Sequence, residues 1–106
     1  DSAVLSGEEA GSHGIQGIGA GFIPDILKED LIDQIIRISR NNAVSTARKV
    51  ARNEGLLGGI SSGANIAASL RLAEELNKNN SNEPQTILTF APDTGERYLS
   101  TDLFSE

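Results

Sequence analysis

Apolar residues recur at helical spacing in the middle of the chain. They stand at positions i, i+1, i+4, i+7 and i+8, and they are Ala43, Val44, Ala47, Val50 and Ala51. This spacing draws one apolar stripe along a helix. Ser39 is placed to cap the N-terminus of that helix, and Gly55 stands where a residue in the left-handed conformation commonly ends one. The pattern predicts a helix that follows Ser39 and ends near Asn53.

A second helical pattern follows, with apolar residues on two faces. One face is formed by Ile66, Leu70, Ala73 and Leu76, and the other by Ala64, Ala68 and Leu72. A helix with two apolar faces is expected to pack between a sheet and a neighbouring element. Ser61 or Ser62 is placed to cap its start by accepting a hydrogen bond from a free backbone N–H. The polar residues 77–83 predict a connection after it.

Shorter apolar runs flank the two helices. Residues 34–38 are rich in isoleucine and residues 85–90 carry Ile, Leu and Phe, so both predict strands. Between the helices, residues 56–60 are apolar and interrupted by glycine, which indicates a buried extended segment. Residues 25–33 predict a short helix or turn, and residues 92–95 a turn. The order strand, helix, apolar segment, helix, strand is an α/β pattern with parallel neighbours.

Composition limits the classes of protein and of partner. The 106 residues suffice for one domain, and 38% hydrophobic residues with few aromatics give only a thin core, as expected of a piece of something larger. The absence of Cys excludes disulfides and thiolate nucleophiles. A net charge of -6 disfavours nonspecific binding to nucleic acid and to anionic membranes. No apolar run approaches the roughly 18 residues of a membrane helix. We therefore expect a cytoplasmic protein that binds neither nucleic acid nor a membrane.

The N-terminal stretch offers no metal site. Residues 1–14 have no sustained period and predict an exposed loop. His13 is the only histidine, and the chain has neither a cysteine nor carboxylates at ligand spacing to complete a site with it. A histidine on a surface loop is the simpler interpretation, and we predict no metal.

Alternating glycines follow at Gly17-Ile18-Gly19-Ala20-Gly21. They do not match a dinucleotide-binding fingerprint, because Phe22 stands where the third glycine should be and no strand precedes them. Glycines without a Cβ let the backbone approach a small ligand closely or adopt positive φ. A tight turn that joins a loop to a helix is the alternative interpretation.

The segment Gly59-Ile60-Ser61-Ser62-Gly63-Ala64 places a pair of hydroxyls where a helix should begin. The positive end of the helix dipole lies beside them, so they could orient a ligand as well as start the helix. An ordinary helix cap is the alternative, because such caps are common.

Together, three segments carry a family resemblance. Residues 15–24 (IQGIGAGFIP), 54–64 (EGLLGGISSGA) and 95–101 (GERYLST) closely resemble, in the same order, the C-terminal third of cysteine synthase (O-acetylserine sulfhydrylase). These enzymes use pyridoxal phosphate and are of the tryptophan-synthase-β type. The resemblance implies that residues 1–106 form a single C-terminal portion of the large cofactor-binding domain. That domain has three αβα layers with a mainly parallel sheet, and this portion is incomplete without the upstream chain.

The resemblance also implies roles for particular residues. The first serine of the Ser-Ser-Gly motif faces the pyridine nitrogen in the family, which corresponds to Ser61, with Ser62 as the alternative. The glycine-rich loop lines the active-site mouth, so Gly17, Ile18, Gly19 and Ala20 are expected to form a wall on the substrate side. The resemblance further implies that the tail at 95–101 returns beneath the cofactor and that Pro92-Asp93 lies near its ring. A purely structural tail is the simpler interpretation of these residues.

No catalytic residue is expected in this chain. In the family, the Schiff-base lysine, the carboxylate-binding loop and the phosphate-binding loop lie upstream of the matched region, and none of those motifs occurs here. The chain alone is therefore expected to be inactive, whereas the parent enzyme forms cysteine and acetate from O-acetylserine and sulfide.

Other functions fit part of this pattern. A relative of cystathionine β-synthase would share related glycine-rich and Ser-Gly motifs. A noncatalytic domain could instead pack on a partner chain, either the rest of its own enzyme or, by family analogy, the C-terminal tail of serine acetyltransferase. The family also implies a homodimer.

Overall fold

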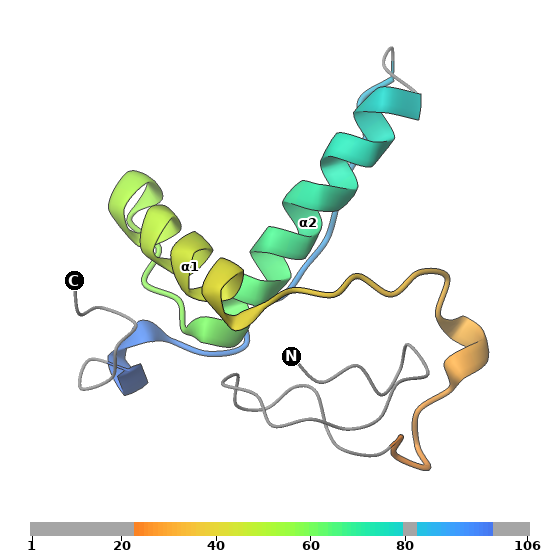
Figure 1. Cartoon of the computed structure of the whole chain (residues 1–106), viewed down its shortest axis with the longest axis horizontal. Helices are drawn as coiled ribbons and strands as arrows, with labels where there is room; N and C mark the ends of the chain where they lie inside the picture. The colour runs from red at the N-terminus through yellow and green to blue at the C-terminus, as the bar shows by residue number, and fades with distance from the viewer. Residues whose placement is uncertain (1–22, 80–82, 99–106) are drawn as a thin grey trace.

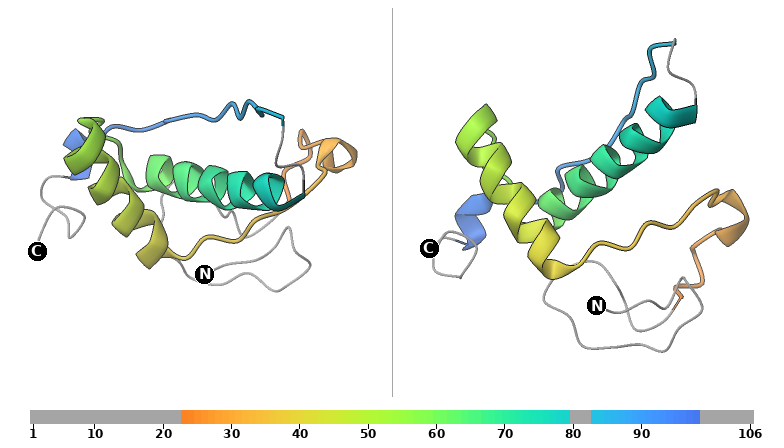
Figure 2. Two further views of the ribbon diagram at one scale, coloured as in Figure 1. Left: turned by 90° about the horizontal axis from the view of Figure 1, so that it is seen from above. Right: turned by 45° about the horizontal axis from the view of Figure 1, so that its top comes forward.

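Two helices that meet in a V dominate the computed structural model, which describes residues 23–79 and 83–98 (Figure 1). The helices are α1 (Arg40–Glu54) and α2 (Ile60–Asn79), and the short 3-10 helices η2 (Glu29–Leu31) and η3 (Gly95–Tyr98) stand before and after them. Extended loops lead into α1 and return alongside α2 from its C-terminal end (Figure 2). Residues 1–14 and the glycines of residues 17–21 lie outside the described residues.

Both ends of α1 are capped as the sequence predicts. The hydroxyl Oγ of Ser39 accepts a hydrogen bond of 3.2 Å from the backbone N–H of Asn42. Gly55 adopts the left-handed conformation with φ 73°, and its N–H donates to the carbonyl of Ala51. Arg52 stands in the last turn, where a cation favours the negative end of the helix dipole. The local sequence therefore predicts both ends of this helix.

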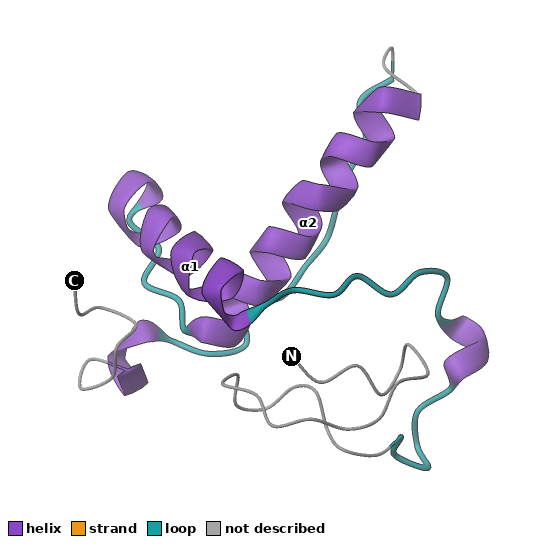
Figure 3. Cartoon of the chain, in the orientation of Figure 1, coloured by secondary structure: helices purple, strands orange, loops and turns teal. Residues whose placement is uncertain are grey.

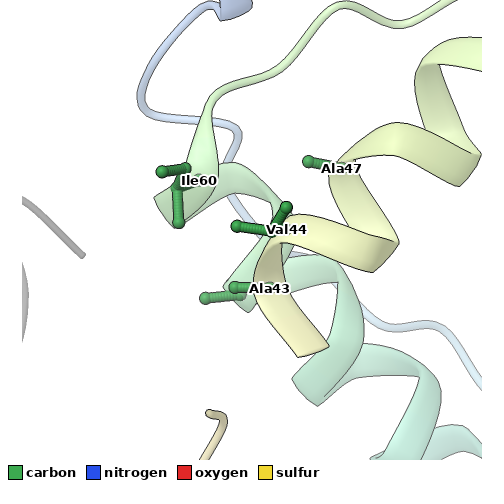
Figure 4. Close-up of a cluster of buried hydrophobic side chains, with 5 residues drawn as sticks. Ala43, Val44, Ala47 and Ile60 are labelled. Carbon is green, nitrogen blue, oxygen red and sulfur yellow. The ribbon is translucent and has the colours of Figure 1, made fainter. Parts of the chain in front are cut away.

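The core lies where the two helices cross. It consists of Ala43, Val44, Ala47, Ile60 and Ala64, with Ile38 packed against it (Figure 4). Gly63 permits the close approach, because a Cβ at that position would stand 2.2 Å from the carbonyl oxygen of Ala43. Small side chains bring the first turn of α2 directly onto the backbone of α1.

The predicted strands are not formed among the described residues, which contain helices and loops (Figure 3). Residues 34–38 and 85–90 have an extended course but no sheet partner, so their prediction as strands is not met here. A ladder needs a second strand about 4.8 Å away, and residues 23–79 and 83–98 supply only the isolated antiparallel bridge between Gly58 and Thr94. Side chains of α2 hold the two segments instead.

These side chains leave α2 on different faces. The amide of Asn65 donates to the carbonyl of Phe90 at 2.9 Å, and the guanidinium of Arg71 donates to the carbonyl of Arg37 at 2.8 Å. Six residues separate the two donors, so they stand about 120° apart around the helix axis. Each extended segment is therefore attached to its own side of α2.

Other local predictions are met in part. The turn at residues 25–26 and η2 agree with the short helix or turn expected over residues 25–33. Residues 56–60 are less buried than expected, since Leu56 and Leu57 are exposed while Gly58 and Gly59 are buried. The helix α2 continues to Asn79, so the expected connection over residues 77–83 begins later than predicted.

Many large apolar side chains are exposed. Among the described residues they include Ile26, Leu31, Leu70, Leu88 and Phe90. Exposed apolar surface of this extent is typical of a region that another part of a protein covers. None of the described helices is long and apolar enough to cross a membrane.

Candidate functional site

The first turn of α2 is the most enclosed part of the described chain. Residues 60–64 are all buried, and this turn holds both serines of the Ser-Ser-Gly motif. Ser61 is 5% exposed and Ser62 is 0% exposed. Neither serine is the N-cap, because the helix begins one residue earlier, at Ile60. The prediction that one of them caps the helix is therefore wrong.

Asp93 supplies the cap from a distant part of the sequence. The backbone N–H of Ser62 donates to Oδ1 of Asp93 at 3.0 Å. The Ser62 hydroxyl lies 2.9 Å from the carbonyl oxygen of Asp93 and also contacts Oδ1, so its single proton is directed at these two acceptors. A carboxylate at this end of a helix also stabilises the positive end of the dipole. The Ser62 hydroxyl is thus committed to Asp93.

Backbone bonds join the same two segments. The N–H of Gly59 donates to the carbonyl of Asp93 at 3.3 Å, and the N–H of Gly95 donates to the carbonyl of Leu57 at 3.0 Å. Gly58 lies close beneath Ser62, because a Cβ there would stand 2.9 Å from the Ser62 Cβ. The turn at residues 92–95 is therefore docked onto the start of α2.

Ser61 differs from its neighbour. Its side chain is buried, yet no hydrogen bond joins its hydroxyl to any other residue in the described ranges. Successive residues of a helix point about 100° apart, so the Ser61 side chain leaves the turn in another direction from the Ser62 side chain. A hydroxyl can donate one hydrogen bond and accept others. Ser61 is the better candidate to contact a ligand.

The chain's lysines are placed as surface residues. Lys28, Lys49 and Lys78 are all exposed, whereas a reactive amine needs a desolvated setting. The part of the chain that the structure describes contains no group of His, Cys, Asp and Glu side chains able to hold a metal ion. Gly17, Ile18, Gly19 and Ala20 lie outside the described residues, as do His13 and residues 99–101 of the tail.

Sequence reasoning missed the pairing of Ser62 with Asp93. The resemblance placed Asp93 near the cofactor ring but gave it no protein partner. Aspartate in a Pro-Asp-Thr-Gly segment is an ordinary turn residue, and 31 positions separate it from Ser62. The only signal in the sequence was that aspartate is a common helix-capping residue, and no local pattern connects Asp93 with α2.

Comparisons with known proteins agree with the motifs. The chain is 49% identical, over 98% of its length, to a cysteine synthase from Staphylococcus aureus, of which the match covers 32%. The crystal structure of a cysteine synthase from Entamoeba histolytica has a TM-score of 0.90 and 51% identity, and the match covers 99% of this chain and 30% of that one. No model of a protein family matches the chain.

A further solved structure is relevant to the alternative function. The O-acetylserine-dependent cystathionine β-synthase from Helicobacter pylori has a TM-score of 0.85 and 38% identity, and the match covers 98% of this chain and 32% of that one. The chain spans about a third of the length of the relatives that it matches. The resemblance indicated by the motifs is confirmed: over nearly its whole length, this chain is similar to about a third of a cysteine synthase.

Proposed function

We propose that this chain is the C-terminal portion of a pyridoxal-phosphate-dependent cysteine synthase, within its large domain. The complete enzyme would convert O-acetylserine and sulfide to cysteine and acetate in the cytoplasm. The observation that carries the proposal is the pair of serines in the buried first turn of α2, where Ser62 is committed to Asp93 and Ser61 is not. Identity of 49% to a cysteine synthase supports the choice of reaction.

The residues present fit one contact to this cofactor. When bound, pyridoxal phosphate withdraws electrons from the α-carbon of an amino-acid substrate, which allows one group to leave the β-carbon and another to replace it. Ser61 would hold the pyridine nitrogen through its hydroxyl. Because a hydroxyl is neutral, it does not keep that nitrogen protonated as a carboxylate would, which moderates electron withdrawal and suits replacement at the β-carbon.

The other parts of the site would come from the rest of the enzyme. These are the lysine that would bind the cofactor covalently, the loop that would bind its phosphate, and the loop that would bind the carboxylate of the substrate. Gly17, Ile18, Gly19 and Ala20 are proposed to form the wall on the substrate side. If this division is correct, the 106-residue chain mixed with pyridoxal phosphate gives no absorbance from a lysine-bound cofactor.

The sheet of the domain is part of the same proposal. Residues 34–38 and 85–90 would be strands of a mainly parallel sheet that is completed by strands from upstream, with α1 and α2 in one helical layer. Both segments already have an extended course beside α2, and both carry exposed apolar side chains: Ile35 is 41% exposed, Leu88 87% and Phe90 72%. Covering them would complete a three-layer domain.

A specific observation favours a second candidate, an O-acetylserine-dependent cystathionine β-synthase. The Helicobacter pylori enzyme of that name is similar to this chain at 38% identity, compared with 51% for the Entamoeba histolytica cysteine synthase. Cysteine synthase is therefore the preferred function. Offering the complete enzyme homocysteine or sulfide as the acceptor distinguishes the two functions, since a preference for homocysteine would select the second.

Partners are inferred from the same relationship. A homodimer is proposed, as is contact between the substrate mouth and the C-terminal tail of a serine acetyltransferase. If the chain instead serves as a noncatalytic domain that packs on a partner, the complete protein forms no cysteine from O-acetylserine and sulfide.

The direct test is Ser61→Ala in the complete enzyme. We expect the dissociation constant of pyridoxal phosphate to rise about three- to tenfold, which corresponds to the loss of one neutral hydrogen bond. Equilibrium dialysis measures the affinity, and cysteine formation is assayed beside it. Ser45→Ala is the matched control, because Ser45 is exposed on α1. Unchanged affinity and turnover in Ser61→Ala would remove Ser61 from the site.

A further inference from the structure

The position of Ser61 depends on the backbone of the turn that carries it. A serine side chain has a single heavy-atom torsion, so the place of its oxygen follows from the position and rotation of the helix turn. No hydrogen bond to the described residues holds the Ser61 hydroxyl itself. Any group that fixes this turn therefore also fixes the point from which Ser61 reaches a ligand.

The turn is fixed on two sides. On the side of α1, Gly63 lies against the backbone of Ala43 and the side chain of Ala47, where an added Cβ would be 2.2 Å and 2.9 Å from the nearest atoms of these two residues. On the other side, Asp93 binds both the backbone N–H and the hydroxyl of Ser62. Packing prevents the turn from moving toward α1, while directional bonds to Asp93 define its rotation.

Asp93 contacts the start of α2 through several of its atoms. Its backbone carbonyl accepts from Gly59 at 3.3 Å, one residue before α2 begins. Its N–H points to the Ser62 oxygen at 3.4 Å, and its second carboxylate oxygen is buried. The main chain and the side chain of Asp93 thus contact the start of α2 together.

We propose that Asp93 is a positioning residue, which acts through Ser62 to hold the Ser61 hydroxyl in place for the cofactor. This inference rests on the proposed function, because it takes Ser61 as the contact to the pyridine nitrogen. Asp93 itself needs no contact with the cofactor. The proposal predicts that the effect of Asp93 on cofactor binding passes through Ser61.

A double-mutant cycle in the complete enzyme tests that dependence. Asp93→Ala is expected to weaken pyridoxal-phosphate binding about threefold, and no more than Ser61→Ala does. In the Ser61→Ala background, Asp93→Ala should change the affinity less than about twofold, because residues that act as a unit are not additive. A merely structural role would give equal losses in both backgrounds, and that result would overturn the proposal.

Conservative variants separate hydrogen bonding from charge. Asp93→Asn keeps an oxygen at the Oδ1 position and should restore affinity to within about twofold of the unmodified enzyme. Ser62→Ala removes the hydroxyl but keeps the backbone donor, and it provides a second cycle with Ser61→Ala if Asp93→Ala does not fold. An additive loss in that second cycle would also overturn the proposal.

Hydrogen exchange of the cofactor-free enzyme gives an independent readout. Asp93→Ala should speed amide exchange at residues 60–64, while the control Asn65→Ala should not. Asn65 joins the same helix to the same distant segment through the carbonyl of Phe90, outside the first turn. Exchange that is unchanged in Asp93→Ala would count against the positioning role.

The two proposals fail in different ways. If Ser61→Ala leaves cofactor affinity unchanged, the proposed site itself is wrong. If Ser61→Ala weakens binding while Asp93→Ala and Ser62→Ala do not, the site stands and only the positioning role of Asp93 is wrong.

Discussion

The two ends of α2 lie in contrasting surroundings. Residues 60–64 are buried against α1 and the turn that contains Asp93, whereas Leu70 is 58% exposed and the residues from 77 to 79 are exposed. At the first end, small residues pack backbone against backbone, and Asp93 bonds the backbone N–H and the hydroxyl of Ser62. At the second, apolar side chains face outward and single side-chain bonds hold the extended segments. The chain thus buries its pair of serines by itself, but it leaves large apolar side chains such as Leu70 exposed farther along α2.

The largest expected effect lies on the extended segment that returns alongside α2 and ends at Phe90. Phe90→Ala in the complete enzyme should lower the free energy of unfolding by about 3 to 5 kcal/mol, since the proposed sheet would bury this ring. Denaturant unfolding measures the loss, and Thr89→Ala, an exposed neighbour, is the control. A change within about 0.5 kcal/mol, as for a surface position, would show that nothing covers this segment.

A smaller loss is expected at the buried end, from Gly63→Ala. Alanine normally favours a helix over glycine by up to about 1 kcal/mol, but here its Cβ would meet the backbone of Ala43. We expect a net destabilisation of about 3 kcal/mol from overpacking. Thermal unfolding followed by circular dichroism measures it, with Ser69→Ala in the middle of α2 as the control. A stabilised protein would mean that the helices are not in close contact.

The smallest effect concerns the bond between Arg71 and the carbonyl of Arg37. Arg71 is exposed, so Arg71→Ala should cost only about 0.5 to 1 kcal/mol. Denaturant midpoints compared with those of Arg71→Lys, which keeps the charge but loses the planar fork, measure the contribution of the bond. A loss as large as that in Gly63→Ala would contradict the contrast between the two ends.

Local chemistry made part of this fold predictable. The serine cap, the apolar stripe and the left-handed glycine of α1 all lie within one short segment, and each predicts the same helix. The start of α2 was harder, because its cap comes from Asp93, which is 31 positions away. Spacing within a helix cannot reveal such a partner.

The predicted strands show a different limit. Residues 34–38 and 85–90 have the composition of strands, and they do run extended beside α2. A strand is completed by hydrogen bonds to another strand, and composition does not say where that neighbour is. The preference of Ser61 over Ser62 was likewise visible only from a family resemblance until the bonds of Ser62 were known.

The extended segment that ends at Phe90 has a consequence for handling this chain by itself. Leu88 and Phe90 are largely exposed on a stretch with strand-like composition, and such a stretch is a template on which a second copy can add. When produced without the remainder of an enzyme, the polypeptide should therefore accumulate as insoluble assemblies. Its recovery in soluble form would depend on co-production with the rest of the proposed enzyme.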